Sequence, residues 1–83
     1  MKTQYEEMDG IVVLNIAEDE QVESEIANFR AKLPTNPFVV ISTSRNWQDA
    51  RSAFESGAID YLTKRPKPKA LAEICRRQLP LTW

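Results

Sequence analysis

The chain has 83 residues, 42% of them hydrophobic and 28% charged, which is the balance of a globular domain and excludes a wholly disordered protein. Its one cysteine, Cys75, excludes an internal disulfide, and the lack of histidine excludes histidine-based catalytic triads and metal sites. The sequence contains no run of 18 apolar residues, so it predicts no membrane-spanning helix.

The net charge of −1 is the sum of two oppositely charged halves. Residues 1–28 contain eight acids and one base, a net of −7, whereas residues 29–83 contain ten bases and four acids, a net of +6. Such a division can support contact between two copies, but a solvated face at each end is the more ordinary interpretation.

The first part of the chain predicts one strand followed by one helix. Residues 1–8 have no clear period and are expected to fray or to add a short strand or turn. The β-branched run at 11–16 predicts a strand buried on both faces. Apolar residues at helical spacing predict a helix over about 20–33, which Pro34 ends.

A second strand and helix follow. Residues 38–41 are all apolar and predict another buried strand. Ser44 or Asn46 can cap the next helix, and Gly57 can stop it. Five apolar residues fall on one side of this helix: Trp47, Ala50, Ala53, Phe54 and Ala58. Trp47 is expected to pack with its helix or, if the helix faces a partner, to be an exposed anchor.

A third unit completes the pattern. We expect a strand at 59–63 and a helix that begins near Pro68 and ends at Pro80. Its apolar side consists of Leu71, Ile74, Cys75 and Leu79. Three strand–helix units predict an α/β fold, a three-layer sandwich with parallel strands and right-handed crossovers. The predicted domain covers residues 10–80, after an N-terminal segment (1–9) and before a C-terminal tail (81–83).

The stretch from Gly57 to Lys64 resembles the fifth strand of receiver domains, the phospho-accepting modules of two-component response regulators. In that family a helix ends at a Gly-Ala pair, an apolar strand follows, and a lysine at its end reaches the active site. Residues 10–79 resemble the second half of this fold, strand 3 to helix 5 of a sheet with strand order 2-1-3-4-5. The resemblance is most specific between Trp47 and Lys64, and strands 1 and 2 are missing.

The resemblance implies three positions of a vestigial phosphorylation site. Asn15 stands in place of the phospho-accepting aspartate, Ser42 matches the hydroxyl residue after strand 4, and Lys64 matches the lysine. An amide has no carboxylate nucleophile, and the family's Mg²⁺-binding acidic pair would follow the missing strand 1. The acids at 18–20 fit a helix N-terminus better than a metal cage. We therefore expect no phosphorylation, no enzymatic activity, no metal and no cofactor.

The resemblance also implies a protein-interaction face. The usual output surface of the family is helix 4, strand 5 and helix 5, which here contributes Trp47, Tyr61, Arg65 and Lys69. Tyr61 matches an aromatic residue whose rotamer reports phosphorylation in typical receivers, although packing is the more ordinary role for such a residue. The predicted function is that of a regulatory interaction or dimerisation module in signalling.

The loss of strands 1 and 2 would leave the strand at 11–16 as a sheet edge. Four residues of this edge have neither charge nor proline to block pairing: Ile11, Val12, Val13 and Leu14. A small domain cannot easily tolerate such an edge. We expect a homodimer joined strand to strand, or a protein partner; residues 1–8 folded back as a covering strand are the competing solution.

A basic cluster supports a different hypothesis, that of a nucleic-acid-associated protein. Its members are Lys64, Arg65, Lys67, Lys69, Arg76 and Arg77. The cluster lacks interleaved aromatic residues, so nucleic acid is a less favoured partner than a protein, and a solvated loop explains the charges. No membrane or small-molecule partner is expected. The lone Cys75 and the lack of a signal-peptide pattern predict a cytoplasmic protein.

Overall fold

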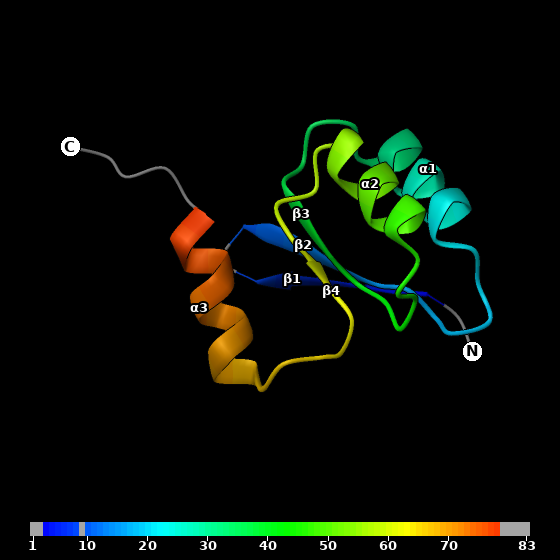
Figure 1. Cartoon of the computed structure of the whole chain (residues 1–83). Helices are drawn as coiled ribbons and strands as arrows, with labels where there is room; N and C mark the ends of the chain where they lie inside the picture. Colours follow the sequence, from blue (N-terminus) through cyan, green and yellow to red (C-terminus); the bar gives the residue numbers. More distant parts are fainter. Residues whose placement is uncertain (1–2, 9, 79–83) are drawn as a thin grey trace.

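The computed structural model describes residues 3–8 and 10–78, and in these ranges it contains four strands and three helices (Figure 1). In chain order they are β1 (Gln4–Met8), β2 (Ile11–Asn15), α1 (Val22–Lys32), β3 (Phe38–Ile41), α2 (Trp47–Glu55), β4 (Tyr61–Leu62) and α3 (Pro68–Gln78). The expected α/β class is confirmed. Leu79, Pro80 and the tail at 81–83 lie outside the described residues. Within the described part, no helix combines the length and apolar character needed to cross a membrane.

The strands form one sheet in the order β1-β2-β3-β4. The pairs β2–β3 and β3–β4 are parallel, as the alternation of strands and helices predicts. β4 is shorter than the expected strand at 59–63. The ladder nevertheless begins before it, because Ile59 donates from its backbone to the Phe38 carbonyl (2.8 Å) and the Asp60 carbonyl accepts from Val40 (3.0 Å).

β1 pairs antiparallel with β2 and covers the edge that the sequence predicts to be open. Tyr5 lies opposite Leu14 and Met8 opposite Ile11, and Gly10 has the positive φ (+82°) of the connecting turn. In the predicted dimer edge, residues 12–14 therefore have a strand on each side, and Ile11 pairs with Met8 of β1. The expectation of an exposed edge is wrong, because the competing solution, a strand folded back from residues 1–8, satisfies these backbone groups within one chain.

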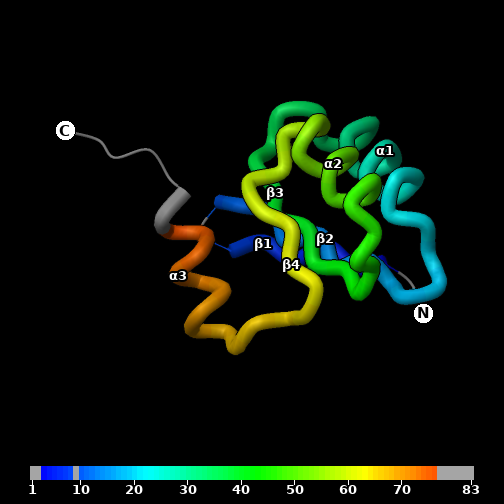
Figure 2. The backbone as a smooth tube through the Cα atoms, viewed as in Figure 1, coloured from blue at the N-terminus to red at the C-terminus, as the bar shows by residue number. Residues whose placement is uncertain are grey.

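An apolar cluster lies on each face of the sheet. On one face, residues of β2 and β3 pack with α1, Ala53 of α2 and Ala58. On the other face, Leu71 and Cys75 of α3 cover the alternate residues of the same strands. Figure 2 shows α3 on the opposite side of the strands from α1 and α2. Successive side chains of a strand point to opposite faces, so burial of both faces explains why β2 and β3 are continuously apolar.

The two largest apolar residues of α2, Trp47 and Phe54, do not lie on its buried side. Asn46 caps the helix by accepting from the Gln48 backbone N–H (3.0 Å), and Gly57 has a φ of +95° after its end, as expected. Ala53 is buried, but Trp47 is 65% exposed and Phe54 is 51% exposed. Small side chains let this helix lie close to the sheet, and its aromatic residues then point outward.

Arg30 of α1 connects the helices with the loop that follows α1. Its Nε donates to the Ser56 carbonyl at the end of α2 (2.9 Å), and its guanidinium lies 4.4 Å from the centre of the Phe38 ring. Its Nη1 donates to three loop carbonyls, those of Leu33 (3.2 Å), Pro34 (3.2 Å) and Asn36 (2.8 Å). One side chain thus satisfies backbone groups that the ends of both helices leave unpaired.

Candidate interaction face

The fold brings the three residues of the predicted vestigial site to one edge of the sheet. Asn15 ends β2, Ser42 follows β3, and Lys64 lies two residues after β4. Parallel strands place their carboxyl ends together, and ladder bonds continue there: Ile16 donates to the Ile41 carbonyl (2.8 Å) and Ser42 to the Leu62 carbonyl (2.8 Å). This edge is where open α/β sheets usually bind ligands.

Asn15 and Ser42 nevertheless belong to opposite faces of the sheet. Asn15 alternates with Ile11 and Val13, which pack under α3, and it is half-buried. Ser42 alternates with Val40 on the α1–α2 face and is only 5% exposed. Its Oγ accepts from the Ser44 backbone N–H (3.2 Å), which gives Ser42 a local turn-stabilising partner. Lys64 is exposed.

An open acidic depression of about 320 Å³ lies beside Ser42. It is lined by Glu18, Glu20, Gln21, Val22, Glu23, Ser42, Thr43, Ser44 and Asp49. Ser44 Oγ donates to Asp49 Oδ2 (2.5 Å), so one of these carboxylates already has a hydroxyl partner. Within the described ranges, no three acidic or cysteine side chains are arranged to hold a metal ion.

A larger hollow of about 600 Å³ lies between β1 and α1. Its lining residues are Thr3, Tyr5, Glu20, Glu25, Asn28, Ala31 and Lys32. Burial, with a smaller contribution from the negative charge of Glu25, raises the pKa of Tyr5 above its ordinary value of 10.0. The Lys32 ammonium lies 5.9 Å from the centre of the Tyr5 ring, so a cation of the chain itself already occupies part of this hollow.

The four predicted interaction residues differ in how freely they face solvent. Trp47 is largely exposed on α2, and Lys69 is exposed in the first turn of α3. Tyr61 is half-buried, and its hydroxyl donates to the Ser44 carbonyl (3.0 Å). Arg65 is bound within the chain: its Nη2 lies 2.6 Å from Glu6 Oε2 and ties the loop before α3 to β1.

Phe54 is the residue of this surface that sequence reasoning missed. It lies seven residues after Trp47, which places both on one side of α2 after two turns. Arg51 lies between them and pairs with Glu55 (3.5 Å). The seven-residue spacing is visible in the sequence. The side of the helix that faces the sheet is known only from the structure, in which Ala53 is buried.

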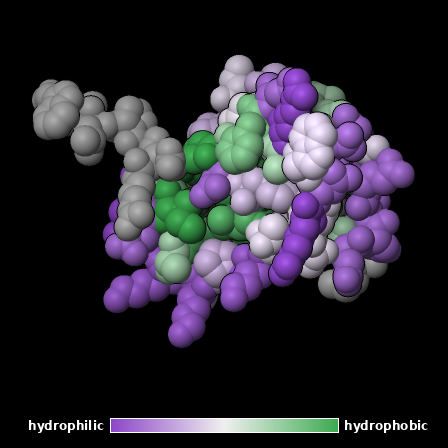
Figure 3. All heavy atoms as spheres, in the orientation of Figure 1, coloured by the Kyte–Doolittle hydropathy of each residue, from purple (hydrophilic) through white to green (hydrophobic). Residues whose placement is uncertain are grey.

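A second apolar surface lies at β4, on the side of the sheet that α3 covers. Three half-buried residues contribute there: Ile59, Leu62 and Ile74. Figure 3 shows hydrophobic atoms gathered between α3 and β4. β4 is the last strand of the sheet, and in the described part of the chain no strand pairs with its outer edge. We call this surface, with Trp47 and Phe54, the α2–β4–α3 face.

Comparison with protein-family models, curated proteins and solved structures gives no match to this chain. The chemistry and geometry of the chain's own surface are therefore the basis for a proposed function. The structure offers an aromatic helix face and an unpaired outer edge of β4, together with open hollows beside Ser42 and between β1 and α1.

Proposed function

We propose that this chain is a phosphorylation-incompetent, receiver-like module that acts by binding a protein through the α2–β4–α3 face. One observation carries the proposal: Trp47 and Phe54 expose 65% and 51% of their surface on the same side of a short helix. Aromatic residues at the centre of such faces commonly dominate the energy of protein association. Exposed apolar surface of this kind is costly to a lone domain and is typical of an interface.

Strand order supports the receiver-like part of the proposal. The parallel neighbours β2, β3 and β4 correspond to strands 3, 4 and 5 of the family order. With α1 and α2 on one face and α3 on the other, the complete arrangement would be a three-layer sandwich. β1 departs from the family pattern, because it fills the place beside β2 but runs antiparallel to it.

The chemistry at the strand ends supports phosphorylation incompetence. Asn15 is neutral and cannot attack a phosphoryl group as a carboxylate does. Asn15 and Ser42 also belong to opposite faces of the sheet, which does not favour a single pocket. We therefore propose a binding module without enzymatic activity.

The phosphorylation part is tested with acetyl phosphate and Mg²⁺, with intact mass as the readout and an active receiver domain as positive control. Neither the natural chain nor Asn15→Asp should gain a phosphoryl group, because the metal that neutralises the incoming phosphate would still lack acidic ligands. A phosphorylated natural chain would overturn the proposal. Phosphorylation of Asn15→Asp alone would show that one substitution restores the site.

The binding part is tested by placing a photo-crosslinking phenylalanine analogue at single exposed positions of the chain in its own cells. Position 54 should form protein adducts, and the matched position Gln4, exposed on β1, should not. Ser42→Ala and Lys64→Ala should leave the adducts of position 54 unchanged. Equal crosslinking at positions 54 and 4 would contradict an interaction face on α2.

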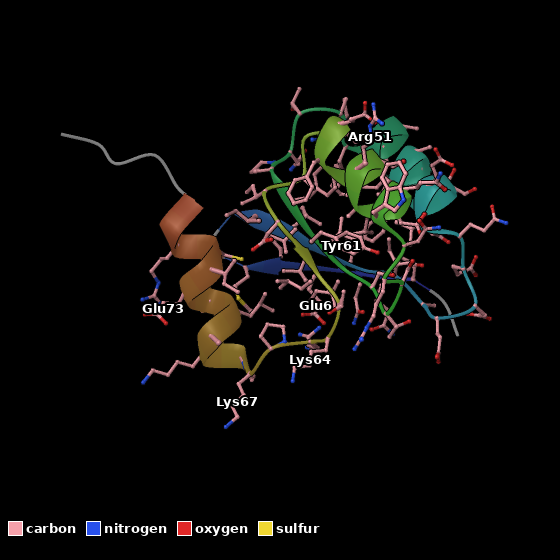
Figure 4. All side chains as sticks on the ribbon, viewed as in Figure 1. Glu6, Arg51, Tyr61, Lys64, Lys67 and Glu73 are labelled. Atoms are coloured by element: carbon pink, nitrogen blue, oxygen red, sulfur yellow. The ribbon has the colours of Figure 1, made fainter. Side chains whose placement is uncertain are left out.

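A second candidate function rests on the lysines around the start of α3. Lys64, Lys67 and Lys69 are exposed, and Figure 4 shows Lys64 and Lys67 extending away from the sheet. Arg65 is less suited to this role because Glu6 neutralises it. A mobility shift with duplex or single-stranded nucleic acid that weakens steeply with salt would favour this function over protein binding.

A further inference from the structure

The outer side of α2 is nearly symmetric about its own midpoint. Trp47 and Phe54 lie near its two ends, about 10 Å apart along the axis. Arg51 lies between them, labelled in Figure 4, and its side chain is 67% exposed. A surface that binds its own copy about a two-fold axis must be self-complementary in this sense.

We propose that the partner of this face is a second copy of the chain, with α2 packed antiparallel against α2 of the other copy about a two-fold axis. The inference rests on the proposed interaction face and specifies its occupant. In this alignment Trp47 of each copy packs against Phe54 of the other. Both aromatic residues are exposed in the single chain. The two-fold axis would bury them in two equivalent Trp47–Phe54 contacts.

The charges around α2 fit the same alignment. Arg45, exposed just before the helix, comes within one residue of Glu55 of the other copy, so each end of the contact gains a pair of opposite charges. Antiparallel helices also oppose their dipoles favourably. The two Arg51 side chains come closest to the axis, and each has Glu55 of its own helix at 3.5 Å to offset their repulsion.

The size of the contact sets its strength. A depression of about 320 Å³ runs along the same helix and reaches Glu23 of α1, so a second helix has room to settle beside Trp47. Nine residues of helix cannot bury the surface of a permanent dimer. We expect a reversible dimer with a Kd of roughly 10–100 µM, which is typical of small, transient interfaces.

Sedimentation of the natural chain over a concentration series from about 5 to 500 µM tests the dimer directly. Trp47→Ala and Phe54→Ala should each raise Kd about tenfold or more, and Arg45→Glu should also weaken association. Glu73→Ala, an exposed change on α3, is the matched control and should have no effect. Circular dichroism should show unchanged folding for all four variants, since each residue is exposed.

Substitutions of Arg51 distinguish the two-fold contact from other arrangements. Arg51→Gln removes the like-charge pair at the axis and should lower Kd about threefold. Arg51→Cys, oxidised with copper phenanthroline, should form a disulfide-linked dimer across the axis, whereas Gln4→Cys should not. A monomer at every concentration, or Arg51→Cys that crosslinks no better than Gln4→Cys, would overturn the inference. Neither result bears on phosphorylation or on crosslinking to other proteins, so the proposed function would fail separately.

Discussion

Two clusters of aromatic residues, each with an arginine, lie on different sides of this small domain. In the inner cluster, the ring centres of Phe29 and Phe38 are 4.8 Å apart. The Tyr5 ring lies edge-on to Phe29, with 5.5 Å between the ring centres, and the Arg30 guanidinium lies over Phe38. The outer cluster is Trp47, Phe54 and Arg51 on α2, and it is open to solvent. The same residue types therefore serve structure in one place and remain available for binding in the other.

The difference lies in what the arginine contacts. Arg30 donates to four backbone carbonyls and lies over an aromatic ring. Arg51 has an exposed carboxylate of its own helix as its partner, a kind of pair that contributes little to folding. Loss of the inner arginine should thus destabilise the fold, and loss of the outer one should change only association.

Of the changes at the two arginines, Arg30→Ala is expected to have the larger effect. We expect a loss of about 2–4 kcal/mol in the free energy of unfolding, because several carbonyls lose their donor and a cation–π contact disappears. Urea unfolding measures the change, with Arg51→Ala as the control, which should stay within about 0.5 kcal/mol of the natural chain. Arg30→Lys should recover little, since an ammonium cannot reproduce the guanidinium geometry. A similar loss for Arg30→Ala and Arg51→Ala would remove the distinction between the clusters.

A smaller loss is expected for Gly57→Ala, about 1–3 kcal/mol. Gly57 has a φ of +95°, and an added Cβ would lie 2.8 Å from Arg30 Nη2. Gly10→Ala is the matched control, because Gly10 also has a positive φ but its Cβ would meet nothing within 4 Å. Thermal unfolding should therefore show a larger loss at Gly57 than at Gly10. Equal losses would mean that the contact with Arg30 has no energetic consequence.

Tyr5 should make stability depend weakly on alkaline pH. Burial and Glu25 raise its pKa in the folded state, so above the ordinary value of 10.0 the folded chain retains a proton that the unfolded chain loses. Stability should accordingly fall as pH rises through that range. In urea unfolding between pH 9 and 11, the free energy of unfolding should decline less steeply for Tyr5→Phe than for the natural chain. The difference should be small, because a single, partly exposed side chain causes it. An unchanged slope would show that Tyr5 ionises equally easily in both states.

The smallest effect on folding is expected for Phe54→Ser. The side chain is 51% exposed, so its removal should alter the free energy of unfolding by less than about 0.5 kcal/mol. Phe29→Ser, in the inner cluster, is the paired comparison and should prevent stable folding, because Phe29 is fully buried. Chemical unfolding of both variants measures the contrast. A large destabilisation by Phe54→Ser would mean that the outer cluster supports the fold.

The sequence predicted best the elements that are buried on both faces. β3 lies at the predicted residues 38–41, because an apolar run is a local signal of a buried strand. α3 begins at the predicted Pro68, because proline favours the first turn of a helix whatever its surroundings. For β1 the sequence does not decide between a frayed end, a turn and a strand. An edge strand that contains two glutamates shows little alternation of apolar and polar residues. Neither Arg30 nor Phe54 could be assigned. Loop carbonyls reach Arg30 only after folding, and the side of α2 that faces the sheet depends on packing.

The pairing of β1 with β2 also bears on the order in which the chain can fold. A hairpin closed by a short turn at Gly10 joins residues that are close in sequence, so it can form within microseconds and pair the backbone N–H and C=O groups along one edge of β2. The ion pair between Glu6 and Arg65 spans 59 residues and cannot form until the last unit of the sheet has docked. The hairpin can thus cover one edge of β2 before the other elements dock, whereas the ion pair can form only after the fold is complete.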